Sequence, residues 1–318
     1  MKRGVFDILR RGLDNALANW GLIVVRVIEM FVFVALTIAS LLAMVVPILV
    51  SVGIQISDIK SPDDVESAML ALMDKWVLLI WVLAGFLVLM LLFVALHSLV
   101  TAGCARVLID ADRVAGAPVE GPRSRYHVFS TARWWEGAKR GWWAVFWIYN
   151  FAWGVAGLIL LVPLLPTLAL TLIFREDPAI AITSGCIGLA LSVMLMIIVG
   201  VVTGIWTNRA VADWAAEEMS ASAALSGAWR AIKADAGRHV LIVLALIVVA
   251  IAGSSLFSMF SVFASLGEGM HRTMTVNFFT MPLRLFGTVL NWIFSSFVAN
   301  WMLAAFGALA VEAKLPRA

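Results

Sequence analysis

Residues 224–250 read ALSGAWRAIKADAGRHVLIVLALIVVA, and this stretch decides the fold. A charged helical pattern runs directly into a long apolar segment, with Gly237 between the two parts. In the first part, Leu225 and Trp229 share one helical face, while Arg230 and Lys233 lie on another. This order is typical of an amphipathic helix at a membrane surface that leads into a membrane-spanning helix.

The composition of the whole chain is that of an integral membrane protein. Of its 318 residues, 63% are hydrophobic and 14% are charged, and the mean hydropathy is +0.99. A soluble domain is roughly half apolar and about a quarter charged. The net charge of +3 would also suit nucleic-acid binding. The basic residues lie beside apolar runs, however, which favours orientation in a bilayer and argues against a nucleic-acid partner.

Six segments are apolar over at least the ~20 residues that cross a bilayer. They cover about 27–51, 77–104, 143–173, 180–207, 239–265 and 283–311. The predicted fold class is therefore an all-α polytopic membrane protein, with one membrane domain over residues 1–318. Arg26 and Glu29, near the start of the first span, are three residues apart. Their shared helical face favours an ion pair in the headgroup layer over a buried functional pair.

The loops between these spans alternate in charge. The loop after the first span is acidic and contains Asp58 and Asp63, whereas residues 106–140 hold mostly basic charges. By the positive-inside rule, the basic loop, residues 208–238 and both termini lie in the cytoplasm. We therefore expect a multi-pass protein of the bacterial cytoplasmic (inner) membrane.

The opening stretch has two counterparts in the chain. LRRGLDNALANWG (9–21), FSTARWWEGAKRG (129–141) and LSGAWRAIKADAG (225–237) each precede a pair of predicted spans. The pattern predicts three pseudo-repeats, about 4–112, 123–215 and 220–315, each with an interfacial amphipathic helix and a helical hairpin. The alignment places the following residues in register: Leu9 with Phe129 and Leu225, and Gly21 with Gly141 and Gly237.

The ends of the second and fourth spans share a pair of opposite charges. Arg106 and Asp110 are four residues apart, and so are Arg209 and Asp213. That spacing puts both side chains on one helical face and predicts an ion pair at the membrane boundary. An anchoring role is favoured over a catalytic one. After the sixth span the match fails, because Glu312 has no arginine at the corresponding place.

The amphipathic helices admit two roles. They could lie in the headgroup plane, with Ile8 and Leu9 in the acyl boundary and Arg10 and Arg11 facing anionic lipid. They could instead form a cytoplasmic platform for a protein partner or for a second copy of the chain. The tryptophans of RWWEGAKRGWWAVFW (133–147) favour the interface with membrane lipids, since an indole ring prefers that boundary.

A family resemblance is carried by EEMSASAALSGAWRAIKADAGRHVLIVLAL (217–246) and by the preceding TNRAVADW (207–214). This combination resembles the multi-span bacterial membrane domains associated with glycerophosphodiester phosphodiesterases and related uncharacterised six-helix families. The resemblance covers about residues 208–250, with a fainter echo at 4–40. It implies a membrane-embedded helical domain without established chemistry of its own, and we recognise no phosphodiesterase catalytic domain in the sequence.

Groups that could support catalysis are sparse in the spans. His97 is inside a span, but Ser98 points to a different helix face, and Cys104 and Cys186 belong to no CxxC or Cys/His motif. We expect no enzymatic activity, no cofactor and no metal site. Interhelical hydrogen bonds worth about 0.6–2 kcal/mol explain polar residues within spans more simply than a substrate path does. The candidate intramembrane polar residues are His97, Asn150, Asn291 and Asn300.

Small and helix-breaking residues predict details of the spans. Gly200 and Gly204 have the spacing that allows two helices to approach closely, and Pro163 and Pro166 should break or kink the third span. An intramembrane carboxylate, as ion-coupled transporters use, is not evident. The sequence thus predicts a noncatalytic accessory or scaffold subunit with lipid-facing amphipathic helices. The alternative is a transporter or lipid-handling protein with a cavity between the pseudo-repeats.

Overall fold

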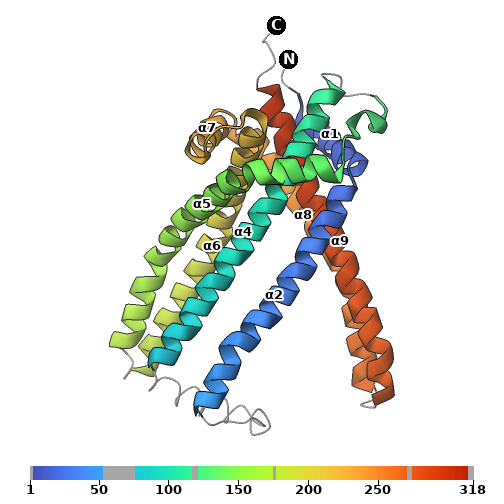
Figure 1. Cartoon of the computed structure of the whole chain (residues 1–318). Helices are drawn as coiled ribbons and strands as arrows, with labels where there is room; N and C mark the ends of the chain where they lie inside the picture. The colour runs from blue at the N-terminus through green and yellow to red at the C-terminus, as the bar shows by residue number, and fades with distance from the viewer. Residues whose placement is uncertain (1–2, 53–75, 117–120, 175–176, 271–273, 314–318) are drawn as a thin grey trace. The chain divides into compact units, whose positions relative to one another are not determined.

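The computed structural model describes residues 3–52, 76–116, 121–174, 177–270 and 274–313 (Figure 1). Asp58 and Asp63 of the acidic loop lie outside these residues. The described residues form α-helices and one short 3₁₀ helix, η2, with no strand among them. The helices are α1 (Val5–Ala18), α2 (Gly21–Val52), α4 (Trp76–Ala115), η2 (Arg123–Tyr126), α5 (Thr131–Ile173), α6 (Pro178–Glu217), α7 (Ala221–Ala234), α8 (Ala236–Met270) and α9 (Met274–Glu312).

The described chain contains six helices that are long and apolar enough to cross a membrane. This result confirms the all-α class and is consistent with a multi-pass integral membrane protein. Several of the helices continue past the predicted spans, because their charged ends pack against protein. The candidate spans are Gly21–Pro47, Ile80–Ala115, Thr131–Thr171, Ile182–Glu217, Ala236–Phe260 and Met281–Glu312.

The chain divides into two compact units. The main unit comprises residues 1–24 and 98–318, and the hairpin unit comprises residues 25–97. Within the hairpin unit, α2 packs against α4 through Phe33 and Phe93, whose ring centroids lie 4.7 Å apart.

Buried residues of the main unit gather where α4, α6 and α9 end. The Arg106 Nη1 atom donates a hydrogen bond to the Ala215 carbonyl at 3.3 Å, which joins α4 to α6. A β-carbon at Gly307 would lie 2.9 Å from Ile109 Cδ1, so α9 approaches α4 closely. The backbone N–H of Arg3, near the N-terminus, donates to Glu312 Oε1 at the end of α9, at 3.1 Å. Both ends of the described chain therefore meet here, and we call these three helix ends the terminal core.

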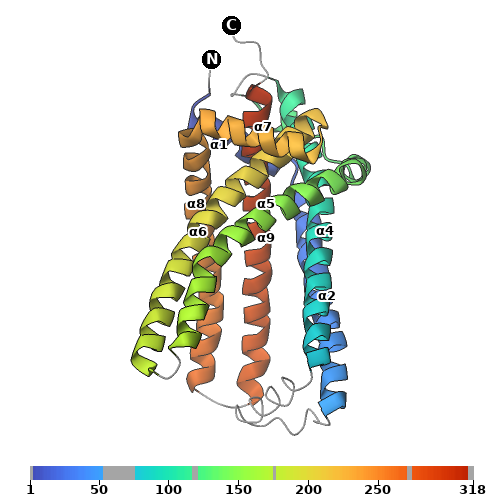
Figure 2. The ribbon, with the colours of Figure 1, turned by 90° about the vertical axis from the view of Figure 1, so that its left-hand side faces the viewer.

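The predicted surface helices take two forms in the structure. The first and third are the separate helices α1 and α7, and Figure 2 shows α7 lying across the end of α6. The second predicted helix, 129–141, is instead the beginning of the continuous helix α5. Ser130 caps this helix, and its hydroxyl accepts a hydrogen bond from the Arg133 backbone N–H at 3.2 Å.

The prolines do not break the third span, and the prediction of a close approach at the glycines is wrong. Helix α5 continues through Pro163 and Pro166 without a break. Tertiary packing and side-chain hydrogen bonds allow proline inside a spanning helix. Gly200 and Gly204 of α6 have no atom from another part of the structure within 4 Å of an added β-carbon. The close approach of α6 to α5 occurs instead at Gly188, where a β-carbon would collide with Thr167.

Candidate functional site

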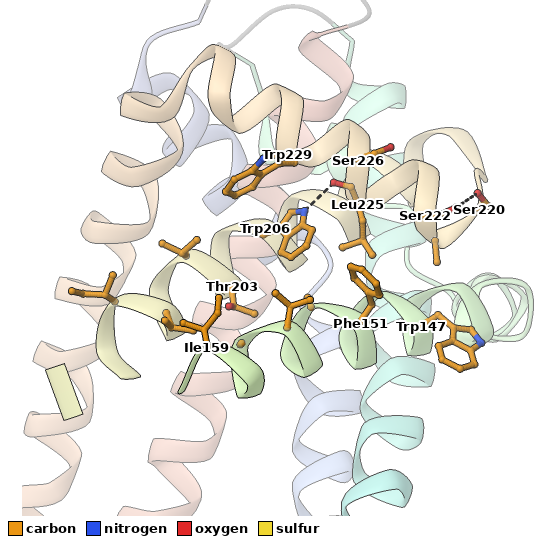
Figure 3. A pocket seen from close by; sticks show the side chains of 17 residues that line it. Trp147, Phe151, Ile159, Thr203, Trp206, Ser220, Ser222, Leu225, Ser226 and Trp229 are labelled. Carbon is orange, nitrogen blue, oxygen red and sulfur yellow. Dashed lines mark hydrogen bonds between the residues drawn. The ribbon is translucent and has the colours of Figure 1, made fainter. Parts of the chain in front are cut away.

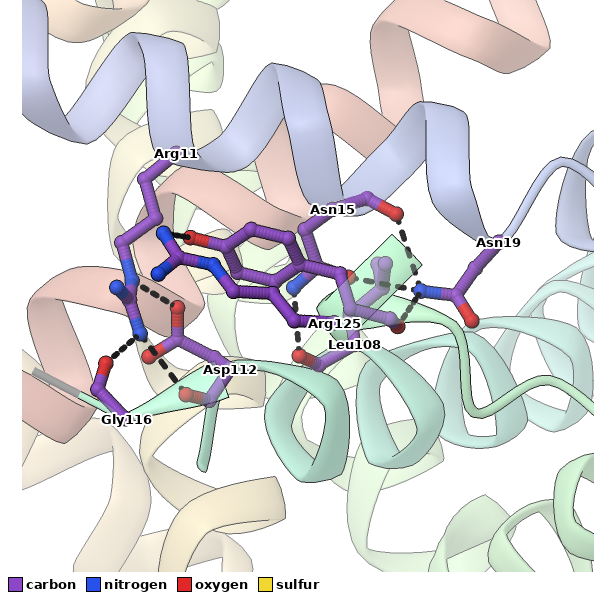
Figure 4. Close-up of polar contacts among 8 residues, drawn as sticks. Arg11, Asn15, Asn19, Leu108, Asp112, Gly116 and Arg125 are labelled. Atoms are coloured by element: carbon purple, nitrogen blue, oxygen red, sulfur yellow. Dashed lines mark hydrogen bonds and ion pairs between the residues drawn. The ribbon is translucent and has the colours of Figure 1, made fainter. Parts of the chain in front are cut away.

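A buried ion pair fixes α1 to the end of α4 (Figure 4). The Arg11 Nε atom donates to Asp112 Oδ1 at 2.5 Å, and the two side chains are 0% and 1% exposed. The second guanidinium nitrogen, Nη2, donates to the carbonyls of Asp112 and Gly116 at 2.9 and 2.6 Å. The prediction that Arg11 faces anionic lipid is therefore wrong, because its charge is satisfied inside the protein.

Two asparagines continue this contact along the same face of α1. Asn15 Nδ2 donates to the Leu108 carbonyl at 2.8 Å, and Asn19 Nδ2 donates to the Tyr126 carbonyl at 2.8 Å. Arg11, Asn15 and Asn19 recur every four residues, which was a sequence signal for a buried polar stripe. We call these three residues and Asp112 the α1 anchor.

The apolar face of α1 packs against α9. Ile8 and Leu9 are buried, and a β-carbon at Gly12 would lie 2.9 Å from the Ala305 backbone nitrogen. Trp301 Nε1 donates a hydrogen bond to the Leu9 carbonyl at 2.8 Å. Ile8 and Leu9 therefore contact protein and not the acyl boundary, which corrects the prediction made for them.

A similar hydrogen bond joins α7 to α6. Trp206 Nε1 donates to the Leu225 carbonyl at 2.9 Å. Ala224, Leu225 and Ala228 are buried on the same face of α7. Small side chains, Leu225 and one indole hydrogen bond thus hold α7 on α6.

A large pocket of about 930 Å³ opens between α5, α6 and α7 (Figure 3). Its volume lies within the ~300–1,000 Å³ typical of small-molecule sites. We call it the α7 pocket. Its walls are mostly aliphatic and aromatic side chains from the two long helices, and hydroxyl groups come mainly from α7 and its cap. It is lined by Trp147, Phe151, Ala152, Val155, Ala156, Ile159, Ile198, Val199, Val202, Thr203, Trp206, Ser220, Ala221, Ser222, Leu225, Ser226 and Trp229.

Three aromatic rings shape one wall of the α7 pocket. The ring centroids of Phe151 and Trp206 lie 6.3 Å apart, and those of Trp206 and Trp229 lie 5.7 Å apart. The Lys233 Nζ atom lies 5.4 Å from the centroid of the Trp229 ring, which is cation–π distance. A positive charge is therefore held next to an otherwise apolar pocket.

The predicted ion pairs are observed at the ends of α4 and α6. Arg106 Nε lies 3.5 Å from Asp110 Oδ2, and Arg106 Nη1 lies 2.6 Å from Glu218 Oε1. Arg209 and Asp213 form a two-pronged pair at 3.1 and 3.0 Å, and both are buried. The first pair joins α4 to the residue after α6, and its three side chains line a small polar pocket of about 110 Å³. The second pair lies within α6.

A further ion pair, between Arg238 and Glu312, lies in the terminal core. The Arg238 Nη2 atom donates to Glu312 Oε2 at 2.8 Å, so the residue that broke the sequence pattern pairs with the start of α8. Partial burial, and next the nearby charge of Arg11, lowers the pKa of the Arg3 guanidinium from its ordinary value. Arg3 remains charged at neutral pH, because arginine is not deprotonated in proteins.

The hairpin unit contains a buried carboxylate that the sequence analysis placed in the headgroup layer. Glu29 Oε1 lies 2.7 Å from His97 Nδ1, and Glu29 Oε2 lies 3.6 Å from Arg26 Nη1. Both Arg26 and Glu29 are buried. A carboxylate is thus present inside the candidate span Gly21–Pro47, where charge is held by partners because lipid cannot solvate it.

The other candidate polar residues do not gather at one point. Asn150 Nδ2 donates to the Phe146 carbonyl of its own helix at 2.8 Å. Asn291 and Asn300 lie on α9, about 13 Å apart along the helix axis at 1.5 Å per residue. None of these three, nor His97, is among the residues that line the α7 pocket.

Within the described residues, no group of three or more His, Cys, Asp or Glu side chains could hold a metal ion. Cys104 and Cys186 are free thiols, the first buried and the second exposed.

Comparison of the chain with protein-family models, curated proteins and solved structures finds no significant match.

Proposed function

We propose that this chain is a noncatalytic accessory or scaffold protein of the bacterial cytoplasmic membrane. The uneven packing of its long helices carries the proposal. In the most apolar window of Thr131–Thr171, 6% of the residues are buried, against 61% in Met281–Glu312. Apolar helix surface left open in this way is covered by lipid or by helices of another protein. The resemblance of residues 208–250 to bacterial membrane domains without established chemistry agrees with this role.

The proposal includes three pseudo-repeats, and paired contacts support them. Leu9 and Leu225 align in the sequence, and the carbonyl of each accepts a hydrogen bond from a tryptophan. The donor to Leu9 is Trp301 of α9, and the donor to Leu225 is Trp206 of α6. The aligned Gly21 and Gly141 each lie against an aromatic ring, of Phe129 and Trp214 respectively. Gly237 has no such neighbour within 4 Å of an added β-carbon, so the third copy departs from this pattern.

Site-specific photocrosslinking in cells tests the scaffold role. A photoreactive amino acid replaces Val162 or Leu189, which are 70% and 66% exposed on α5 and α6. A scaffold gives a discrete protein adduct of constant mass from at least one of these positions. The matched control is Val145, which is fully buried in α5 and should give no external adduct. Lipid adducts alone from both exposed positions would contradict a protein-docking role.

Orientation is tested by cysteine labelling. In a variant that lacks Cys104 and Cys186, the substitution Asp63→Cys should react with a membrane-impermeant reagent in intact cells. A cysteine at Arg123, an exposed residue of the predicted cytoplasmic loop, should react after lysis and not before. The opposite pattern would overturn the proposed cytoplasmic location of the termini.

A lipid-handling role is the second candidate, and the α7 pocket favours it. The pocket is lined by residues of the second and third proposed pseudo-repeats, as a cavity between repeats requires. Purification in mild detergent followed by native mass spectrometry separates the two candidates. A retained stoichiometric protein supports the scaffold, and a retained lipid of defined mass supports lipid handling.

A further inference from the structure

We propose that the α7 pocket binds one acyl chain of an anionic phospholipid from the adjoining bilayer, with Lys233 attracting the lipid headgroup. This inference rests on the proposed membrane location.

The walls of the α7 pocket suit a hydrocarbon chain. α5 and α6 contribute side chains such as Ile159, Ile198 and Val202, all within candidate membrane spans. The pocket is therefore built between helices whose surroundings are expected to be acyl chains. The Trp206 N–H already donates to the Leu225 carbonyl, so this ring offers the pocket its apolar surface (Figure 3).

Polar groups lie at the α7 side of the same pocket. Ser220, Ser222 and Ser226 carry exposed hydroxyl groups. The Ser226 hydroxyl donates to the Ala223 carbonyl at 3.0 Å. The Oγ atoms of Ser220 and Ser222 lie 3.2 Å apart, so one proton of that pair remains to donate to an ester oxygen. Ser220 also caps α7, so the positive end of this helix dipole lies on the pocket rim. Lys233 lies in the last turn of α7, about 20 Å along the helix axis from Ser220 at 1.5 Å per residue. These hydroxyl groups therefore mark one end of the pocket, and the headgroup lies at the other end, beside Lys233.

Lys233 supplies the charge complementarity. Its ammonium group lies over the Trp229 ring, and Trp229 itself lines the pocket. An indole that contacts both hydrocarbon and a cation is suited to the boundary between acyl chains and headgroups. The cation favours an anionic phospholipid over a zwitterionic one.

Photolabelling of the purified full-length protein in vesicles tests the acyl-chain site. The probe is phosphatidylglycerol with a diazirine near the end of one acyl chain, added to phosphatidylcholine vesicles. After irradiation, mass spectrometry of peptides should find the label enriched on residues 147–159, 198–206 and 220–229. Equal labelling per exposed residue along all long helices would overturn the proposal.

A substitution that fills the α7 pocket provides the matched comparison. Ser222→Trp places an indole in the pocket from an exposed position, whereas Ala223→Trp places it on an exposed neighbour that does not line the pocket. Ser222→Trp should reduce pocket labelling about tenfold or more, as expected when roughly two methylene groups are displaced. Ala223→Trp should preserve it. Equal labelling of the two variants overturns the site.

The headgroup contribution is tested with two lysines in similar surroundings. Lys233→Gln should lower the preference for phosphatidylglycerol over phosphatidylcholine about fivefold, the effect expected for one lysine near an anionic surface. Lys139→Gln is the control, because Lys139 also lies over a tryptophan, Trp135, at 5.3 Å but outside the pocket. An equal effect of the two substitutions would overturn the assignment of Lys233.

These outcomes are distinguishable from failure of the proposed function. Wild-type protein that floats with the vesicles but lacks pocket labelling would overturn the lipid site while leaving the membrane role intact. A protein that does not associate with vesicles at all would overturn the membrane role first.

Discussion

Helices α1 and α7 align in the sequence, yet they are held by different interactions. α1 is fixed by the α1 anchor, in which Arg11 and Asp112 form a buried ion pair. α7 carries Gly227 and Ala231 where α1 has Arg11 and Asn15. Its contact with α6 depends on small side chains and on the Trp206 hydrogen bond, and the α7 pocket lies beside it.

This difference shows that the same amphipathic pattern can be held to the protein either by a buried charge or by small apolar side chains. A buried charge with several hydrogen bonds specifies one arrangement, because any displacement leaves the charge without a partner. Small apolar side chains do not impose that penalty. We therefore infer that α1 is a fixed structural element and that α7 is the element suited to admit a ligand.

Removing the charge partner of α1 should produce the largest effect. Asp112→Ala leaves Arg11 buried without its carboxylate and should destabilise the protein by about 3–5 kcal/mol. Equilibrium unfolding in mixed detergent micelles measures the change. The control is Asp14→Ala, which breaks an exposed pair with Arg123 at 3.0 Å and should cost at most about 1 kcal/mol. Equal effects would mean that the α1 anchor does not distinguish α1 from α7.

Adding a methyl group to each helix should give effects of opposite sign. Gly12→Ala forces α1 away from the Ala305 backbone and should destabilise the protein by about 1–3 kcal/mol. Gly227→Ala meets no atom within 4 Å and should stabilise α7 by up to about 1 kcal/mol through helix propensity. Thermal unfolding of the two variants under identical conditions tests the contrast. Destabilisation by Gly227→Ala would show that α7 is packed as closely as α1.

The two tryptophan hydrogen bonds should show the smallest difference. Trp206→Phe and Trp301→Phe each remove one hydrogen bond, worth about 0.5–1.5 kcal/mol. We expect local hydrogen exchange to increase more in α7 after Trp206→Phe than in α1 after Trp301→Phe, because the α1 anchor still holds α1. Amide exchange measured by mass spectrometry reports both helices. A larger increase in α1 would reverse the comparison.

Much of the candidate site could not be predicted from the sequence. Arg11 was assigned to the lipid surface, because a surface arginine and a buried one look the same until a partner is known. Asp112 lies 101 residues away from it in the chain. The link between Glu29 and His97 was missed for the same reason, since neither position alone indicates the other. The pocket depends on side chains from three helices, and no local pattern encodes the space between them.

The sequence by itself determined that this chain is helical and contains six apolar segments of membrane-spanning length. Those properties follow from local composition and periodicity. The tertiary structure alone decided which charged residues are buried, that 129–141 continues into α5, and where the α7 pocket opens. These features depend on contacts between residues far apart in the chain, and their free energy comes from complementary shape and charge that exist only after the helices pack.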